Sequence, residues 1–97
     1  MEGLPYSVTT ASGTYRMLKF MPQIDGYYEF YTNKTSGDPQ LFVFAPQGYL
    51  MGSDDDSGGN KNAYLECYLE SDVTYYIAVQ GYNGSATACS VEIWILS

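Results

Sequence analysis

Thr74–Ser85 has the sequence Thr-Tyr-Tyr-Ile-Ala-Val-Gln-Gly-Tyr-Asn-Gly-Ser, and Ala88–Leu96 follows as Ala-Cys-Ser-Val-Glu-Ile-Trp-Ile-Leu. Both segments are rich in β-branched and aromatic residues that alternate with smaller or polar ones, a pattern typical of half-buried β-strands. Between them, Asn83-Gly84 supplies two residues that tolerate the positive φ angles of tight hairpin turns. We therefore predict two strands joined by a hairpin.

The rest of the chain repeats this pattern at intervals typical of a β-sandwich. Helix signals are nearly absent, and the composition includes eleven tyrosines and ten glycines. We predict an all-β fold, an antiparallel β-sandwich with jelly-roll-like connections, over residues 14–97, with residues 1–13 as a linker or a loose leading strand. The other expected strands are Tyr15–Phe20, Tyr27–Thr32, Gln40–Ala45 and Ala63–Leu69.

Side-chain alternation also assigns the faces of the expected strands. Every second residue of a strand points to the same side, so apolar residues at alternate positions indicate the core. The expected core positions are Val73, Tyr75, Ile77 and Val79, then Cys89, Val91, Ile93 and Ile95, and finally Leu65, Cys67 and Leu69.

Composition excludes several classes of function. With 97 residues the chain has the size of one domain, and its net charge of −7 comes with only four lysines and arginines. Nucleic acids and anionic membrane surfaces require a basic patch, so neither is an expected partner. The chain has no histidine, which removes the usual general base and most zinc sites. No apolar run is long enough for a transmembrane helix, and no signal peptide is visible.

An ordered series of motifs carries a family resemblance. The series is Gly26–Phe30, Asp38–Phe44, Gly48–Leu50, Ser53–Asn60, Ala63–Leu65 and Thr74–Tyr82. It resembles the bacterial pre-peptidase C-terminal domain, a β-sandwich module of secreted proteases and other extracellular enzymes. The resemblance covers about residues 14–96. It departs from the family in having three aspartates in the Ser53–Asn60 loop, where two are usual, and in its two cysteines.

The resemblance implies a non-catalytic accessory domain of a secreted or cell-surface protein, part of a longer chain and monomeric. Members of this family aid secretion or processing, or bind protein or polysaccharide substrates of the parent protein, and some bind calcium. Two alternatives remain open: a carbohydrate-binding module that uses an exposed aromatic face, and a structural spacer or adhesion domain. A glycosidase pair formed by Glu66 and Glu92 is disfavoured, because a sandwich of this size has little room for a deep cleft.

The acidic loop has two interpretations. Asp54, Asp55 and Asp56 are adjacent, and together with Asp38 they could supply oxygen ligands to calcium. Alternatively, their carboxylates accept hydrogen bonds from backbone N–H groups of a tight turn, which is the interpretation that we favour. The spacing of an EF-hand is absent.

Aromatic residues on the outer faces of the strands form a second candidate site. Tyr27, Tyr31, Tyr76 and Trp94 could present rings on which a sugar or an apolar side chain stacks. Alternatively, these rings stabilise the sheets by packing across neighbouring strands.

The two cysteines, Cys67 and Cys89, both fall on expected core faces. A disulfide between them and two buried free thiols both fit the pattern, and free thiols are favoured. Neither is expected to be a nucleophile, because no histidine is present to lower its pKa.

Overall fold

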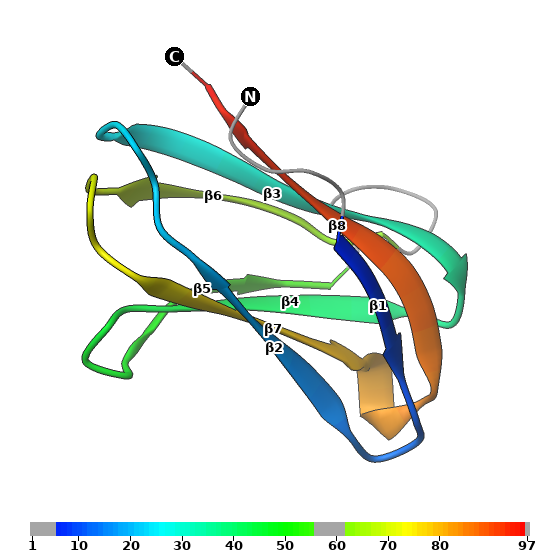
Figure 1. Ribbon diagram of the computed structural model, residues 1–97. Helices are drawn as coiled ribbons and strands as arrows, with labels where there is room; N and C mark the ends of the chain where they lie inside the picture. Colours follow the sequence, from blue (N-terminus) through cyan, green and yellow to red (C-terminus); the bar gives the residue numbers. More distant parts are fainter. Residues whose placement is uncertain (1–5, 56–61, 97) are drawn as a thin grey trace.

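The computed structural model describes residues 6–55 and 62–96, and these residues form eight strands and one short 3-10 turn (Figure 1). Within these ranges no helix is long and apolar enough to span a bilayer. The strands are β1 (Tyr6–Thr10), β2 (Tyr15–Phe20), β3 (Gly26–Ser36), β4 (Pro39–Phe44), β5 (Leu50–Asp54), β6 (Tyr64–Leu69), β7 (Tyr75–Gly81) and β8 (Thr87–Ile95).

The strands form two four-stranded antiparallel sheets packed face to face. Sheet A has the order β1-β8-β3-β6, and sheet B has the order β2-β7-β4-β5. This is the strand order of an eight-stranded jelly roll, so the predicted fold class is confirmed. Among the described strands, β4 and β5 are the one pair that is consecutive in sequence and also hydrogen-bonded; every other connection passes from one sheet to the other.

The predicted hairpin at Asn83-Gly84 is therefore wrong, although the local conformation is as expected. Asn83 has φ 55° and Gly84 has φ 76°. However, β7 pairs with β2 and β4 in sheet B, whereas β8 pairs with β1 and β3 in sheet A. The turn carries the chain from sheet B to sheet A. A hydrogen bond from the Gly13 N–H to the Gly84 carbonyl, 2.8 Å long, ties the turn to the β1–β2 connection.

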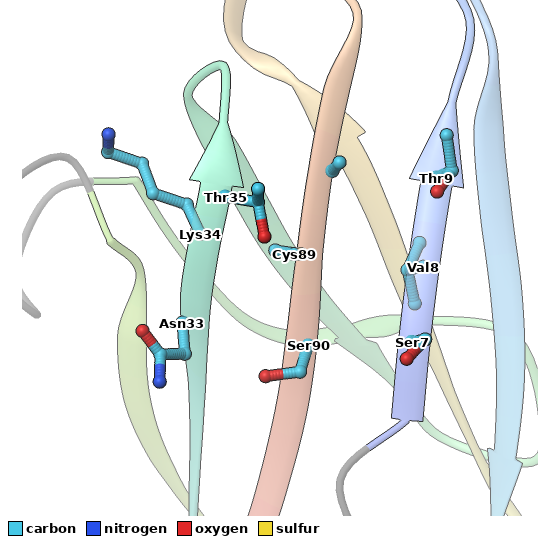
Figure 2. A pocket seen from close by; sticks show the side chains of 9 residues that line it. Ser7, Val8, Thr9, Asn33, Lys34, Thr35, Cys89 and Ser90 are labelled. Carbon is cyan, nitrogen blue, oxygen red and sulfur yellow. The ribbon is translucent and has the colours of Figure 1, made fainter.

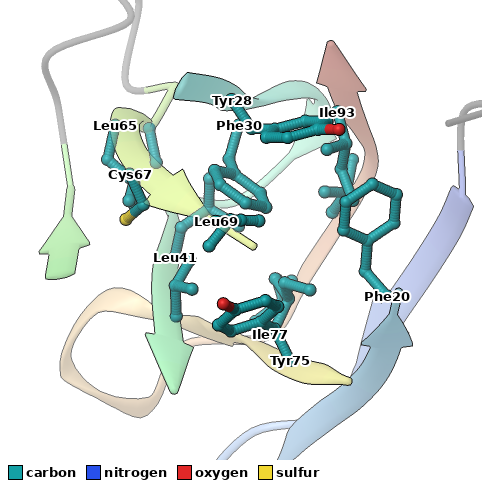
Figure 3. Packing of buried hydrophobic residues seen from close by; sticks show 14 of the residues in the cluster. Phe20, Tyr28, Phe30, Leu41, Leu65, Cys67, Leu69, Tyr75, Ile77 and Ile93 are labelled. Atoms are coloured by element: carbon teal, nitrogen blue, oxygen red, sulfur yellow. The ribbon is translucent and has the colours of Figure 1, made fainter. Parts of the chain in front are cut away.

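The core lies between the sheets and uses the faces that alternation predicted. Of the expected core positions, nine are buried, and Val73 and Ile95 are partly buried and pack against them. Figure 3 shows Tyr28 and Phe30 of β3 pointing into the same core as Leu41 of β4 and Ile77 of β7. Tyr28 is fully buried, and its hydroxyl donates a hydrogen bond to the Ile24 carbonyl at 2.8 Å.

The two cysteines are free, as favoured from the sequence. Along β3, Cys67 of β6 lies opposite Tyr28, whereas Cys89 of β8 lies opposite Lys34. Six residues of an extended strand separate these levels by roughly 20 Å, well beyond the Cα–Cα distance of a disulfide.

Two strands were not predicted as such. Residues 6–10 form β1, which pairs with β8, so the strand alternative holds for this part of residues 1–13. The other is β5, whose Gly52 and Asp54 are residue types depleted in strands. Gly52 is suited to its place by close packing: a Cβ atom there would lie 3.4 Å from Leu65 Cδ1 and 3.5 Å from Cys67 Sγ.

Gly81 is the glycine that the sheet-crossing turn requires most. Its φ of −78° suits any residue, but an added Cβ would overlap the backbone carbonyl of Ser85. We expect Gly81→Ala to lower the free energy of unfolding by about 3 kcal/mol, since backbone atoms must shift. Gly52→Ala is the matched control and should change it by less than about 1 kcal/mol, because its Cβ makes ordinary contacts. Urea denaturation measures both, and equal effects would contradict this account of the turn.

Candidate functional site

The outer face of sheet A brings together aromatic and acidic side chains from three strands. Because alternate residues share a face, the strands that bury Phe30, Leu65 and Ile93 present their other residues outward. We call this surface the tyrosine–glutamate face. It comprises Tyr27, Glu29 and Tyr31 of β3, Tyr64, Glu66 and Tyr68 of β6, and Glu92 and Trp94 of β8.

The strand register arranges these side chains in rows across the sheet. One row is Trp94, Glu29 and Glu66, and the next is Glu92, Tyr31 and Tyr64. In a third row Tyr27 lies opposite Tyr68, and their rings meet edge to face with centroids 5.2 Å apart. Glu29 and Glu92 therefore each have an aromatic residue directly opposite on an adjacent strand, whereas Glu66 lies opposite Glu29.

Glu92 is held by two donors. The Tyr31 hydroxyl donates to Glu92 Oε1 at 2.9 Å, and the Trp94 Nε1–H donates to the same oxygen at 3.1 Å. The hydrogen bond to Glu92, followed by burial, raises the pKa of the Tyr31 phenol, because both favour its protonated form. The carboxylate is thus fixed between two rings.

Glu29 and Glu66 face each other across β3 and β6 and share one hydroxyl. The Tyr64 oxygen lies 3.0 Å from Glu29 Oε2 and 2.5 Å from Glu66 Oε2. The hydrogen bond to Glu66, then burial and the bond to Glu29, raise the pKa of the Tyr64 phenol. A phenol carries one proton and can donate it to one carboxylate at a time. The pair therefore retains acceptor capacity for a further donor.

No described cation belongs to this face. Arg16 and Lys19 lie on β2 in sheet B, and Lys34 lies near the end of β3, opposite Cys89. The two carboxylates directly opposite each other, Glu29 and Glu66, are a like-charge pair of the kind that weakens a sheet. The face is consequently a local concentration of negative charge on a protein that is already acidic.

The structure groups three of the four aromatic residues that the sequence singled out. Tyr27, Tyr31 and Trp94 lie on the tyrosine–glutamate face, whereas Tyr76 lies on β7 in sheet B. Glu29 was not among the site residues predicted from the sequence. Period-two alternation would have placed it between Tyr27 and Tyr31, but its pairing with Glu66 depends on a strand order that alternation does not specify.

The outer face of sheet B is different in character. It has a shallow hollow of about 320 Å³ over Ala78, lined by Tyr15, Met17, Phe42, Phe44 and Gln80. The register places Met17 and Phe42 on either side of Ala78, whose small side chain leaves the space between them.

A further hollow, of about 390 Å³, lies on sheet A next to the tyrosine–glutamate face. Figure 2 shows Ser7 of β1, Ser90 of β8 and Asn33 of β3 along it. These short polar side chains, together with Thr9 and Thr35, continue the outer face of sheet A without aromatic rings.

The predicted calcium ligands are only partly described. Asp56 lies outside the described residues, Asp54 ends β5, and Asp38 precedes β4. Leu41 is the β4 residue opposite Asp54, so Asp38 is offset from Asp54 by three residues, about 10 Å along the strand. Among the described residues no group of three His, Cys, Asp or Glu could hold a metal. The calcium site thus remains a prediction.

Asp54 instead has a structural role in the described chain. Its Oδ2 accepts the Tyr64 backbone N–H at 2.9 Å, which joins the end of β5 to the start of β6 in the other sheet. The donor lies ten residues further along the chain and not within a tight turn at the acidic loop, so the turn interpretation of the loop stays a prediction.

Comparison with known proteins supports the fold. No family model matches the sequence, and no curated protein matches it significantly. Among solved structures, the pre-peptidase C-terminal domain of a Bacillus anthracis collagenase is similar with a TM-score of 0.75 and 6% identity, covering 93% of this chain and 87% of that one. The Yersinia pseudotuberculosis-derived mitogen has a TM-score of 0.70 and 13% identity, covering 95% of this chain and 84% of the mitogen.

The third similar structure is PliG of Aeromonas hydrophila, a periplasmic inhibitor of g-type lysozyme. It has a TM-score of 0.64 and 19% identity, covering 95% of this chain and 82% of the inhibitor. The three are a domain of an enzyme, a mitogen and an enzyme inhibitor, so one fold serves different roles. The predicted resemblance to the pre-peptidase C-terminal domain is supported as a structural likeness, shared with two other kinds of protein.

The role of Asp54 can be separated from metal binding. Asp54→Ala removes the acceptor of the Tyr64 N–H, and we expect it to lower the free energy of unfolding by about 1–2 kcal/mol. The loss should be the same in excess calcium and in chelator, as measured by thermal melting. A loss that appears only in calcium, or a calcium-dependent rise in the melting temperature of the parent, would instead indicate a metal site.

The cysteines should be unreactive while the protein is folded. Burial raises the pKa of each thiol, Cys67 and Cys89, to about 11. At about pH 8 both are therefore protonated as well as shielded, and a disulfide-exchange reagent should label neither. After unfolding in guanidinium, the reagent should label two thiols per chain. The intact mass should not change on reduction. Rapid labelling of the folded protein would contradict the buried arrangement.

Proposed function

We propose that this chain is a non-catalytic accessory domain of an extracytoplasmic bacterial protein, and that its tyrosine–glutamate face binds a positively charged segment of a partner protein. The observation that carries the proposal is the set of three glutamates that lie among partly exposed rings on the tyrosine–glutamate face, to which no described cation belongs.

Charge is the first argument for a cationic partner. Glu29 and Glu66 lie directly opposite each other with one phenolic proton between them, so an added ammonium or guanidinium group would relieve their repulsion. The net charge of −7 would also attract such a partner over a longer range.

The rings are the second argument. Tyr27 is 60% exposed and Tyr68 is 48% exposed, so lysine and arginine side chains could lie against their faces while their charged ends meet the carboxylates. The hydrogen bonds from Tyr31 and Trp94 hold Glu92 in position before any ligand arrives, which limits the entropy lost on binding.

The structural neighbours support a binding role outside the cytoplasm. The lysozyme inhibitor is periplasmic and acts on another protein, and the pre-peptidase C-terminal domain is part of a collagenase. Because their identity to this chain is below one fifth, they support the class of function and supply no ligand residues.

An extended peptide of alternating lysine and serine tests the proposal, since it presents lysines on one side at the spacing of a strand. We expect it to bind, and binding to weaken as salt rises from low concentration to about 0.3 M. Glu29→Gln combined with Glu66→Gln should weaken binding roughly five- to tenfold, as expected for two partly exposed charge pairs.

The control for this test removes the same two charges elsewhere. Asp25→Asn combined with Asp72→Asn changes residues of the connections that flank β3 and β7, and should leave peptide binding unchanged at moderate salt. An equal loss in both double variants would mean that only net charge matters. Binding to insoluble polysaccharides that persists at high salt and in the glutamate variant would indicate a carbohydrate-binding module instead.

A further inference from the structure

A third hollow lies beyond the edge of the tyrosine–glutamate face, at the end of the sandwich. It has a volume of about 340 Å³ and lies between the β4–β5 connection, residues 45–49, and the end of β6. In Figure 1 the β4–β5 and β6–β7 connections are at the same end of the molecule. The residues that matter for its chemistry are Gln47, Tyr49, Tyr68 and Glu70.

Two tyrosine rings from different elements flank this hollow. Tyr49 is 62% exposed and comes from the β4–β5 connection, and Tyr68 is 48% exposed and comes from β6. Exposed rings beside a concave surface are suited to stacking on the C–H face of a ligand ring. Tyr68 is kept in place by its edge-to-face contact with Tyr27.

The frame around the rings is fixed by hydrogen bonds. Within the connection, the Ala45 N–H donates to the Tyr49 carbonyl and the Gly48 N–H donates to the Ala45 carbonyl, both at 2.9 Å. On the other side, the Glu70 N–H donates to the hydroxyl of the buried Tyr75 at 2.9 Å. The hollow is therefore formed before any ligand binds.

The polar groups of the hollow include both kinds of hydrogen-bonding partner. Glu70 supplies carboxylate acceptors, and the Gln47 amide supplies a donor and an acceptor. No lysine or arginine of the described chain lines the hollow, so nothing there would offset the repulsion between Glu70 and an anionic ligand. A purely apolar ligand would desolvate Glu70 and Gln47 without replacing their hydrogen bonds to water.

We propose that this hollow binds one pyranose unit of a neutral carbohydrate. The apolar C–H face of a sugar ring can stack on Tyr49 and Tyr68. Its hydroxyls can donate to the Glu70 carboxylate, and they can both donate to and accept from the Gln47 amide. A single ammonium group would leave the amide donor unused and most of the volume empty. The hollow shares Tyr68 with the tyrosine–glutamate face, but its other lining residues lie outside that face, and the proposal does not rest on the function inferred for that face.

Backbone amide NMR shifts test this site directly. The isotope-labelled chain is titrated with methyl glycosides of glucose, galactose and N-acetylglucosamine to tens of millimolar. With at least one glycoside we expect saturable shifts confined to residues 45–51 and 68–75. Tyr49→Ala and Tyr68→Ala should each weaken the binding about two- to tenfold, and Glu70→Gln should also weaken it.

Tyr82→Ala is the matched control, because Tyr82 is 45% exposed and lies in the turn between β7 and β8 at the opposite end of the sandwich. It should bind the glycoside as the parent does. The proposal is overturned if no glycoside shifts these amides, if Tyr49→Ala binds as well as the parent, or if lysine methyl ester shifts the same amides at lower concentration. The lysine–serine peptide should still bind to Tyr49→Ala, so failure of this site is distinguishable from failure of the other.

Discussion

The pairing of β8 between β1 and β3 is the constraint on which the rest of this structure depends. It places the last strand of the chain in the middle of sheet A, next to the first described strand. Its inward residues Cys89, Val91 and Ile93 are buried in the core. Its outward residues Glu92 and Trp94 complete the tyrosine–glutamate face. One alternating strand thus supplies both the packing that stabilises the sandwich and the side chains that give one surface its chemistry.

Much of this could be predicted from the sequence, because strands and their buried faces are local properties. Tyr15–Phe20 was predicted with its observed bounds, and the alternation in Tyr75–Val79 identified core residues correctly. The order of strands was not predictable in the same way. Asn83-Gly84 adopts the positive φ angles that a hairpin would use, yet this conformation does not determine which sheet receives the following strand.

The same limit explains what was missed in the candidate site. Alternation groups residues within one strand, whereas the Glu29–Glu66 pair and the separation of Tyr76 from Trp94 follow from the order of strands across two sheets. The Tyr49–Tyr68 hollow is a further case, since Tyr49 lies in a connection that has no periodicity.

The two outer faces also differ in charge: sheet A presents three glutamates, and the described outer face of sheet B has Lys19 opposite Tyr76.

The jelly-roll order has a consequence for how the chain acquires its structure. Only β4 and β5 among the described strands can pair with a sequence neighbour, so nearly every other ladder joins distant parts of the chain. Sheet A in particular lacks two of its three ladders until β8 has been synthesised. Long-range pairing of this kind slows folding and exposes unpaired strand edges in partly formed states. The domain must therefore be complete before it can fold, and a nascent chain that ends before Thr87 has no partner for β1.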